Sequence, residues 1–420
     1  MSHHEIAIPM RAKYLTTGTK IVLLIALAGI ATYIYRIFMG IGAVTNLNDQ
    51  YPWGIWISID VATGVALAAG GFTTAAIADI FHKEEYHVIT RPALLTAMLG
   101  YTFVVIGLLA DLGRWYNVWH PIVPTMWQGN SVLFEVGMCV TVYLTVLYIE
   151  FVPIVVERFK GRVNLPGPLA ALNKLFEMLI NLAEKTLGRF TSLFIIAGVV
   201  LSCLHQSSLG TLMVIAPTKV HHLWWTPISP LMFLISAIAV GFPMVIFESI
   251  LATRSFKLKP EVKVLSSLAR YTPFILGAYL ALKIGDMTIR ETWPLVLAFD
   301  KYSIMWLIEM VFGVITPIVI LSIPKYRKTV GGLFTAASMV IGGVALNRID
   351  AFLVAYKPPY ATEAYFPSIY EIMLTAGLIA TLVLVYRALV MIFPIISVPI
   401  EKAEEIKNGT HEKANIMRWS

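Results

Sequence analysis

Ten long apolar stretches constrain the fold of this chain more than any other feature of its sequence. The hydrocarbon core of a bilayer is roughly 30 Å thick, and a helix needs about 20 mainly apolar residues to cross it. Lipid also suits the composition, because 58% of the 420 residues are apolar and only 14% are charged, against roughly a quarter in soluble proteins. We therefore expect transmembrane helices over residues 20–44, 54–80, 92–112, 131–157, 189–214, 228–252, 270–288, 302–323, 331–356 and 368–396.

The predicted fold class is all-α, a polytopic membrane protein in which residues 1–420 form a single integral membrane domain. We expect its ten helices to form two four-helix bundles plus two additional helices. Residues 158–188 carry leucines at helical spacing on one side and polar residues on the other, which predicts an amphipathic connector on the cytoplasmic surface. The charged residues 401–420 are expected to form a cytoplasmic tail.

Basic residues are distributed unevenly between the two sides of the predicted membrane domain. With the N-terminus placed in the cytoplasm, the inside segments contain 23 Lys and Arg residues and the outside segments contain five. Such an excess on one side sets the orientation of membrane proteins. It predicts that both termini are cytoplasmic. The net charge of +7 therefore reflects membrane orientation and does not indicate a nucleic-acid partner.

The sequence offers few ligands for a redox centre. It has two cysteines, Cys139 and Cys203, both inside predicted helices, whereas an iron–sulfur cluster needs about four thiolates. Of the nine histidines, only His205 lies inside a predicted helix and away from its ends. A bis-histidine haem would need a second histidine facing it. We expect no haem, no iron–sulfur cluster and no other metal site in this chain.

Ionisable and polar side chains inside the predicted helices gather near their external ends. Asp60 lies roughly 10 Å below the outer end of its helix at 1.5 Å per residue. Such groups are costly in lipid and are functional candidates by default. The other candidates in the outer half are Asp111, Arg114, Glu135, His205, Gln206 and Ser208. The inner half is poorer, and its acids Asp79, Glu150 and Glu248 are available as stepping stones for protons from the cytoplasm.

A structural interpretation is open for any single charge. Asp111 would then pair with Arg114, and Arg348 with Asp350, to hold helices together. Pairing alone gives no reason for the charges to prefer one half of the membrane. The four polar residues 205–208 cannot share one helix face, because successive residues turn by about 100°. Either this segment lines a cavity or the helix breaks there.

A quinone suits a pocket built from these residue types. Its carbonyls need a hydrogen-bond donor or proton carrier, and a histidine or carboxylate can exchange the protons that accompany its reduction and oxidation. Aromatic side chains such as Trp56 can pack on its ring. Two other function classes stay open. A secondary transporter would place its site near the midplane on broken helices, and a structural anchor would need none of the outer charges for activity.

An ordered set of motifs carries a resemblance over most of the chain. The motifs are PWGIWISID (52–60), RPALL (91–95), DLGRWYN (111–117), NSVLFE (130–135), HQSSLGTL (205–212), KVHHLW (219–224), YSIMWLIE (302–309) and YFP (365–367). Together they resemble the NrfD/PsrC family of quinone-interacting integral membrane subunits, in its HybB/DsrP-like branch.

The resemblance implies a cofactor-free subunit in the prokaryotic cytoplasmic membrane that binds menaquinone or another quinone near its periplasmic face. It implies a ferredoxin-like iron–sulfur partner on that side, with further cytochrome, hydrogenase or sulfur-metabolism subunits, and oxidoreductase activity only within the complex. We assign catalysis to Asp60, His205 and Glu135, and quinone binding to Asp111, Arg114, Gln206, Ser208 and Trp56. The direction of electron flow, the quinone type and the parent complex stay open.

Overall fold

The computed structural model describes residues 5–164 and 167–408, which fold almost entirely into helices. Within these ranges nine helical segments are long and apolar enough to cross a membrane. They are α1 (Thr17–Met39), the second helix (Trp56–Ile80), η4 (Glu84–Tyr86) with α4 (His87–Asp111), α5 (Val132–Phe159), the later part of α6 (Asn173–Val214), α7 (Ser229–Ser255), α11 (Lys301–Met310) with η9 (Val311–Ile315) and α12 (Thr316–Ser322), α14 (Val330–Ile349) with η10 (Asp350–Val354), and α15 (Ile369–Ile392).

The second helix is irregular. It consists of η2 (Trp56–Thr63), α2 (Gly64–Leu67), α3 (Gly70–Ala75) and η3 (Ala76–Ile80). Its segments η2 and η3 are π-helical, as are η9 and η10. The connections hold the short helices η1 (Ile41–Ala43), η5 (Trp115–Asn117), η6 (His120–Ile122), η7 (Pro124–Met126), η8 (Gly167–Leu172), α8 (Val262–Leu268), α10 (Trp293–Leu297), α13 (Pro324–Arg327) and the terminal α16 (Ile400–Asn408).

A tenth helix, α9 (Tyr271–Ile289), packs against α7 and α12. Its 19 residues span roughly 28 Å, although two charged side chains, Lys283 and Asp286, lower its apolar character. Strand β1 (Glu5–Ile8) pairs antiparallel with β2 (Ile396–Pro399), which places both ends of the described chain at one end of the helices. A chain whose ends share one side crosses the membrane an even number of times. The count of ten stays a prediction, and this pairing supports it.

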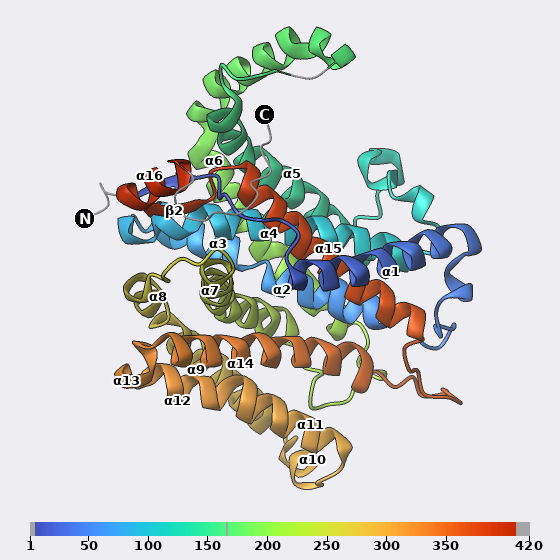
Figure 1. The fold of residues 1–420 in the computed structure, drawn as a ribbon. Coiled ribbons are helices and arrows are strands. Elements are labelled where there is room, and N and C mark those ends of the chain that lie inside the picture. Colours follow the sequence, from blue (N-terminus) through green and yellow to red (C-terminus); the bar gives the residue numbers. More distant parts are fainter. Residues whose placement is uncertain (1–4, 165–166, 409–420) are drawn as a thin grey trace.

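The packing divides the helices as the sequence predicts. The second helix, α4, α5 and α6 form a first bundle, and α7, α9, α12 and α14 form a second one. The remaining pair, α1 and α15, pack along each other and against α4. Figure 1 shows α9, α12 and α14 together on one side of the molecule, with α1 and α15 crossing the other. The second helix joins the bundles, because it contacts both α7 and α14.

Glycines allow the closest helix contacts. A Cβ atom at Gly29 of α1 would overlap the backbone of Gly377 of α15, and one at Gly313 would overlap Gly343 of α14. Backbones that approach this closely gain dispersion contacts in a solvent where apolar side chains gain little from association. The α1–α15 pair is therefore fixed in register, which matters because α15 carries polar residues of the site described below.

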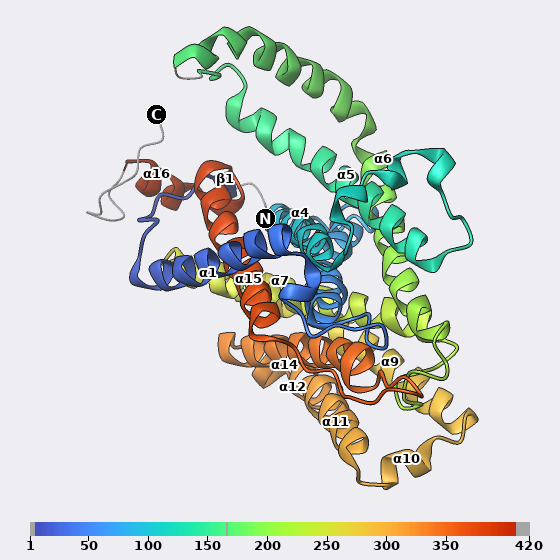
Figure 2. The same ribbon diagram turned by 90° about the vertical axis from the view of Figure 1, so that its right-hand side faces the viewer.

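The region between α5 and α6 differs from the sequence expectation. The sequence predicts a separate connector over 158–188 followed by a helix over 189–214, whereas α6 runs without a break from Asn173 to Val214. Figures 1 and 2 show the first part of α6 projecting with the end of α5 away from the other helices. Its apolar side chains Leu175, Phe176 and Leu182 are exposed, and their contact with a membrane surface stays a prediction. Of the predicted tail, residues 409–420 lie outside the described residues.

Candidate functional site

Asp60 lies in the π-helical segment η2, where the wider turn shifts side chains relative to an α-helix. Only 9% of Asp60 is exposed. Its Oδ2 atom accepts a hydrogen bond of 2.6 Å from the Oγ1 hydroxyl of Thr375 on α15. Gly107 of α4 faces it, and a Cβ atom there would lie 2.7 Å from the Cβ atom of Asp60. The carboxylate is therefore held between α4 and α15, and a π-helical turn is a frequent companion of functional residues.

The neighbours of Asp60 on the same helix also face the bundle. Gly64 and Ala68 lie against α4, where Cβ atoms at Gly64 and Gly100 would each come within 2.9 Å of a neighbouring side chain. Trp56 is buried and donates from its indole nitrogen to the carbonyl oxygen of Glu371 at 3.2 Å. Trp53 points elsewhere and packs on Phe352 of η10. The predicted inward face therefore holds for Asp60, Trp56, Gly64 and Ala68.

A buried arginine and two acids lie at the same end of these helices. Arg36 of α1 is 1% exposed and donates to the carbonyl oxygens of Ala110 at 2.6 Å and Leu112 at 2.5 Å. This places its charge beside Asp111, at the end of α4, where Glu371 also acts on the Asp111 carboxylate. Oδ1 of Asp111 is buried without a hydrogen-bond partner among the described residues.

The structural pairing of Asp111 with Arg114 is not formed. Arg114 is exposed in the loop after α4, and no ion pair joins the two side chains in the described part of the chain. Glu371 instead orders the loops at this end. Its side chain accepts hydrogen bonds from the Tyr365 hydroxyl and from the backbone N–H groups of Asn46 and Ser368.

His205 lies inside the first bundle and is fully buried. Neither of its ring nitrogens has a hydrogen-bond partner among the residues that the structure describes. The ring lies 5.7 Å from that of Tyr101, between centroids, and Tyr101 packs edge-on against Tyr143 at 4.5 Å. The Tyr101 hydroxyl and Ser202 Oγ are also buried without a partner in the described chain. Buried polar groups are usually paired, so this group has spare capacity for a polar ligand or water.

The rest of the polar segment 205–208 joins α6 to its neighbours. Gln206 donates to the carbonyl oxygen of Val65 in α2 at 2.8 Å, and Ser208 donates to Glu135 Oε1 of α5 at 2.5 Å. The helix does not break here, because α6 is continuous through this segment. The expectation of a helix break is therefore wrong. Each polar side chain instead meets a different neighbouring helix.

The predicted pocket residues thus divide between two groups of contacts. The Asp60 cluster comprises Asp60, Trp56, Asp111, Arg36, Glu371, Tyr365 and Thr375. The His205 cluster comprises His205, Gln206, Ser208, Glu135, Tyr101, Tyr143 and Ser202. The second helix and α4 contribute to both. Sequence reasoning placed Arg36 and Glu371 in the outer half without assigning them a role, and it missed Tyr365, Tyr101 and Thr375, which no local pattern distinguishes from ordinary helix or loop residues.

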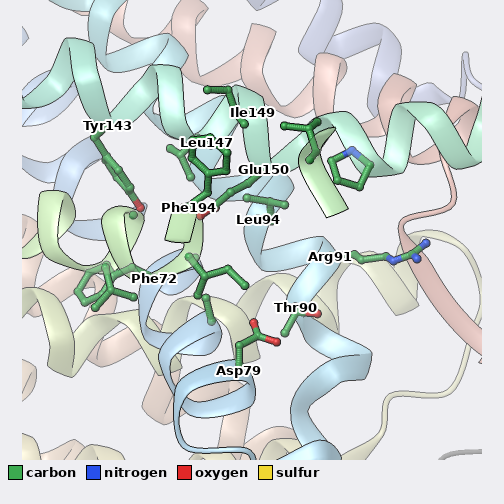
Figure 3. Close-up of a pocket in the computed structure, with 17 residues that line it drawn as sticks. Phe72, Asp79, Thr90, Arg91, Leu94, Tyr143, Leu147, Ile149, Glu150 and Phe194 are labelled. Atoms are coloured by element: carbon green, nitrogen blue, oxygen red, sulfur yellow. The ribbon is translucent and has the colours of Figure 1, made fainter. Parts of the chain in front are cut away.

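Two of the three predicted inner-half acids meet at a cavity of about 150 Å³ between the second helix, α4, α5 and α6. Asp79 of η3 and Glu150 of α5 both line it, and Figure 3 shows their carboxylates at opposite sides. Tyr143 points its hydroxyl into the same space, whereas Arg91 points away, toward Glu157 at 2.7 Å. Because Tyr143 also packs on Tyr101, the cavity reaches the edge of the His205 cluster.

The third acid, Glu248 of α7, has a different environment. Its Oε1 atom accepts a hydrogen bond of 2.5 Å from the Tyr386 hydroxyl of α15, and its Oε2 atom is buried without a partner among the described residues. Tyr386 lines a second cavity of about 460 Å³ at the β1–β2 end, together with Glu5 and Glu261. Burial, and then the nearby Glu5 carboxylate, raise the pKa of Glu261 to about 7. This cavity therefore connects acidic surface groups with the Glu248–Tyr386 pair.

These features define the class of protein: an all-α polytopic membrane protein with ionisable groups buried inside its bundles. Residues 43–356 match the family model described as polysulphide reductase, NrfD. The chain belongs to the NrfD family.

Several relatives align over nearly their whole length. One is the probable Ni/Fe-hydrogenase 2 b-type cytochrome subunit of Escherichia coli, 34% identical over 86% of this chain and 88% of the relative. Another is the integral membrane subunit of menaquinone reductase from Nitratidesulfovibrio vulgaris, 27% identical over 86% and 88%. A third is a selenate reductase subunit from Mesobacillus selenatarsenatis, 24% identical over 93% and 95%. These relatives are integral membrane subunits of quinone-linked respiratory oxidoreductases.

Proposed function

We propose that this chain is the quinone-interacting membrane subunit of a respiratory electron-transfer complex. It binds menaquinone or another quinone near the predicted outer face and exchanges electrons with an iron–sulfur partner subunit docked on that face. The observation that carries the proposal is the Asp60 cluster, a buried acid with a hydroxyl donor inside a bundle of a chain from this family. A relative named for menaquinone reduction supports the choice of ligand.

The donor set fits a quinone. A quinone supplies two carbonyl oxygens that accept hydrogen bonds and take up protons on reduction. Asp60 offers a carboxyl group that can hold a proton beside Thr375. His205 offers two ring nitrogens, and Asp111 an oxygen, that lack partners in the described chain. Such groups exchange protons with a bound substrate, and Trp56 and Glu371 fix the helices that carry them.

Proton supply from the cytoplasm is the finer part of the proposal. The cavity lined by Asp79 and Glu150 opens in the predicted inner half, and the rings of Tyr143 and Tyr101 continue from it to His205. This series of polar groups offers protons a way to the quinone. The pair of Glu248 and Tyr386 beside the second cavity is a parallel entry.

The test is purification of the intact complex from its native membrane. We expect quinone to co-purify with it, an iron–sulfur protein among its subunits, and quinol-linked electron transfer that stops when this chain is deleted. The chain separated from its partners should show no haem or cluster absorbance. Stoichiometric haem in the isolated chain would make His205 a ligand. Substrate transport by this chain alone would favour a secondary transporter.

A further inference from the structure

The second bundle contains a buried charged cluster that the proposed quinone chemistry does not use. Lys283 of α9 is 3% exposed, Glu309 of α11 is 2%, Arg348 of α14 is 1%, and Asp350 of η10 is 0%. Glu309 acts electrostatically on both Lys283 and Asp350, which places the four side chains near one another. Two acids and two bases from four elements therefore share the interior of one bundle.

Two of these side chains are firmly held. Glu309 accepts hydrogen bonds from Trp224 Nε1 at 2.9 Å and from Asn347 Nδ2 at 2.8 Å. The same Asn347 accepts from an Arg348 NH1 group at 2.5 Å, so one amide bridges the acid and the base. The Arg348 guanidinium also lies 3.7 Å over the Phe233 ring. Glu309 and Arg348 are thus oriented by neutral groups between them.

Asp350 has no such support. Both of its carboxylate oxygens are buried without a hydrogen-bond partner in the described part of the chain. The pair with Arg348 that the sequence left open is not formed, because the guanidinium donates to Asn347 and Ser236 instead. An ionised carboxylate buried without a partner is very costly. Asp350 therefore requires a proton of its own, or a donor from outside the chain.

The backbone sets this residue apart as well. Asp350 is the first residue of the π-helical segment η10. Each of the four π-helical segments in the described ranges contains an intramembrane acid or begins two residues after one, namely Asp60, Asp79, Glu309 and Asp350. Segments of this kind often mark functional residues. The π-helical turns of the second bundle thus repeat the arrangement at Asp60.

A polar route links the cluster with the predicted outer face. Lys283 donates to the carbonyl oxygen of Leu223 in the loop before α7 at 2.7 Å. One turn further along α9, Asp286 pairs with Arg290 at 2.6 Å and accepts from Thr226 at 2.7 Å. The side chain of Arg290 is 14% exposed. Polar groups therefore follow one another along α9 from the buried lysine toward the surface.

We propose that Glu309 and Asp350, with Lys283 and Arg348, form a proton-exchange site in the second bundle, separate from the Asp60 cluster. The site takes up a proton and not a metal cation, because the two basic side chains would repel a cation. Tyr279 of α9 also faces Glu309 and Arg348. Proton exchange with the outer side follows the Asp286–Arg290 pair.

The position of the second helix couples this site to the first bundle. The segment η2, which carries Asp60, packs against α14 and η10. A change of charge or shape at Asp60 therefore acts on the helix that carries Arg348 and Asp350. This coupling rests on the proposed quinone function, whereas the exchange site itself does not.

Infrared difference spectroscopy on the assembled complex in lipid vesicles tests the site directly. A pH change on the outer side should produce the carbonyl band of a protonated carboxylic acid. The band should disappear in Asp350→Asn and shift in Asp350→Glu, which keeps the acid and covers the case in which the asparagine variant does not assemble. Glu363→Gln, in an exposed loop, should leave it unchanged. A band that survives in assembled Asp350→Asn, or stays in place in Asp350→Glu, would overturn the proposal.

Proton counting tests the coupling. In vesicles that carry out quinol-linked electron transfer, Asp350→Asn should lower the number of protons moved per electron while electron transfer continues. An unchanged ratio would refute the coupling and leave the infrared result to decide the site. Loss of the proposed quinone function would be recognised separately, as normal electron transfer in Asp60→Asn.

Discussion

In the first bundle Asp60 accepts a hydrogen bond from a hydroxyl of the neighbouring α15, and His205 has no partner for either ring nitrogen within the described chain. In the second bundle Glu309 is fixed by two donors, and a shared amide joins it to Arg348. The contrast teaches that burial alone does not mark a substrate site. Polar groups with spare hydrogen-bonding capacity are available to a ligand, whereas satisfied groups serve structure or carry charge.

The largest expected effect is on turnover. Asp60→Asn keeps the size of the side chain and a hydrogen bond to Thr375 but cannot accept a proton. In the assembled complex we expect quinol-linked electron transfer to fall by about 10²-fold, the scale for removing an acid–base group. Stopped-flow or steady-state rates would measure it, with Asp49→Asn in an exposed outer loop as the matched control. Normal turnover in Asp60→Asn would return Asp60 to a structural role.

The corresponding change in the second bundle should act on stability. Glu309→Gln replaces an acceptor of two hydrogen bonds with an amide whose NH₂ group would face Asn347 or Trp224 as a second donor. Leaving a buried donor unsatisfied costs about 1–3 kcal/mol. Thermal unfolding of the detergent-solubilised chain should therefore begin at a lower temperature, while electron transfer in the assembled complex falls far less than in Asp60→Asn. Equal thermal stability in Glu309→Gln and wild type would contradict the contrast between the bundles.

A milder change tests the donor to Asp60. Thr375→Val keeps the shape of the side chain and removes the hydroxyl that donates at 2.6 Å. Hydrogen bonds to charged groups contribute roughly 1.5–3 kcal/mol, so we expect turnover to fall by about tenfold. Thr381→Val is the matched control, since this α15 hydroxyl bonds only its own helix, at Gly377. If both variants lost turnover equally, general damage to α15 would be the explanation.

Much of the fold follows from the sequence, because runs of about 20 apolar residues and basic loops have no other stable arrangement in a bilayer. The site follows only in part. Asp60 and His205 stand out as polar residues inside apolar helices. Thr375 does not, because its role depends on a contact with a residue 315 positions away. The π-helical turns and the long α6 were equally hidden, since they result from packing between helices and not from local residue pattern.

The smallest expected effect concerns the β1–β2 end, far from either bundle's buried acids. The pKa of Glu261, raised to about 7, means that the folded chain holds this proton more tightly than the unfolded chain does. The stabilising contribution is thus full below the ordinary value and is lost as the pH rises toward 7. Hydrogen exchange of β1 amides should accelerate above pH 7, and Glu261→Gln should flatten that dependence. An identical pH profile in the variant would exclude Glu261 as its origin.

The most direct test of the account is to locate bound quinone in the assembled complex. A photoactivatable quinone analogue would be cross-linked and the labelled peptides identified by mass spectrometry, with excess natural quinone as the competitor. We expect competed label on the second helix near Asp60, on α4 or on α15, and its loss in Asp60→Trp, which fills the space beside Gly107. Competed label confined to α9, α11 and α14 would place the quinone in the second bundle and contradict the account.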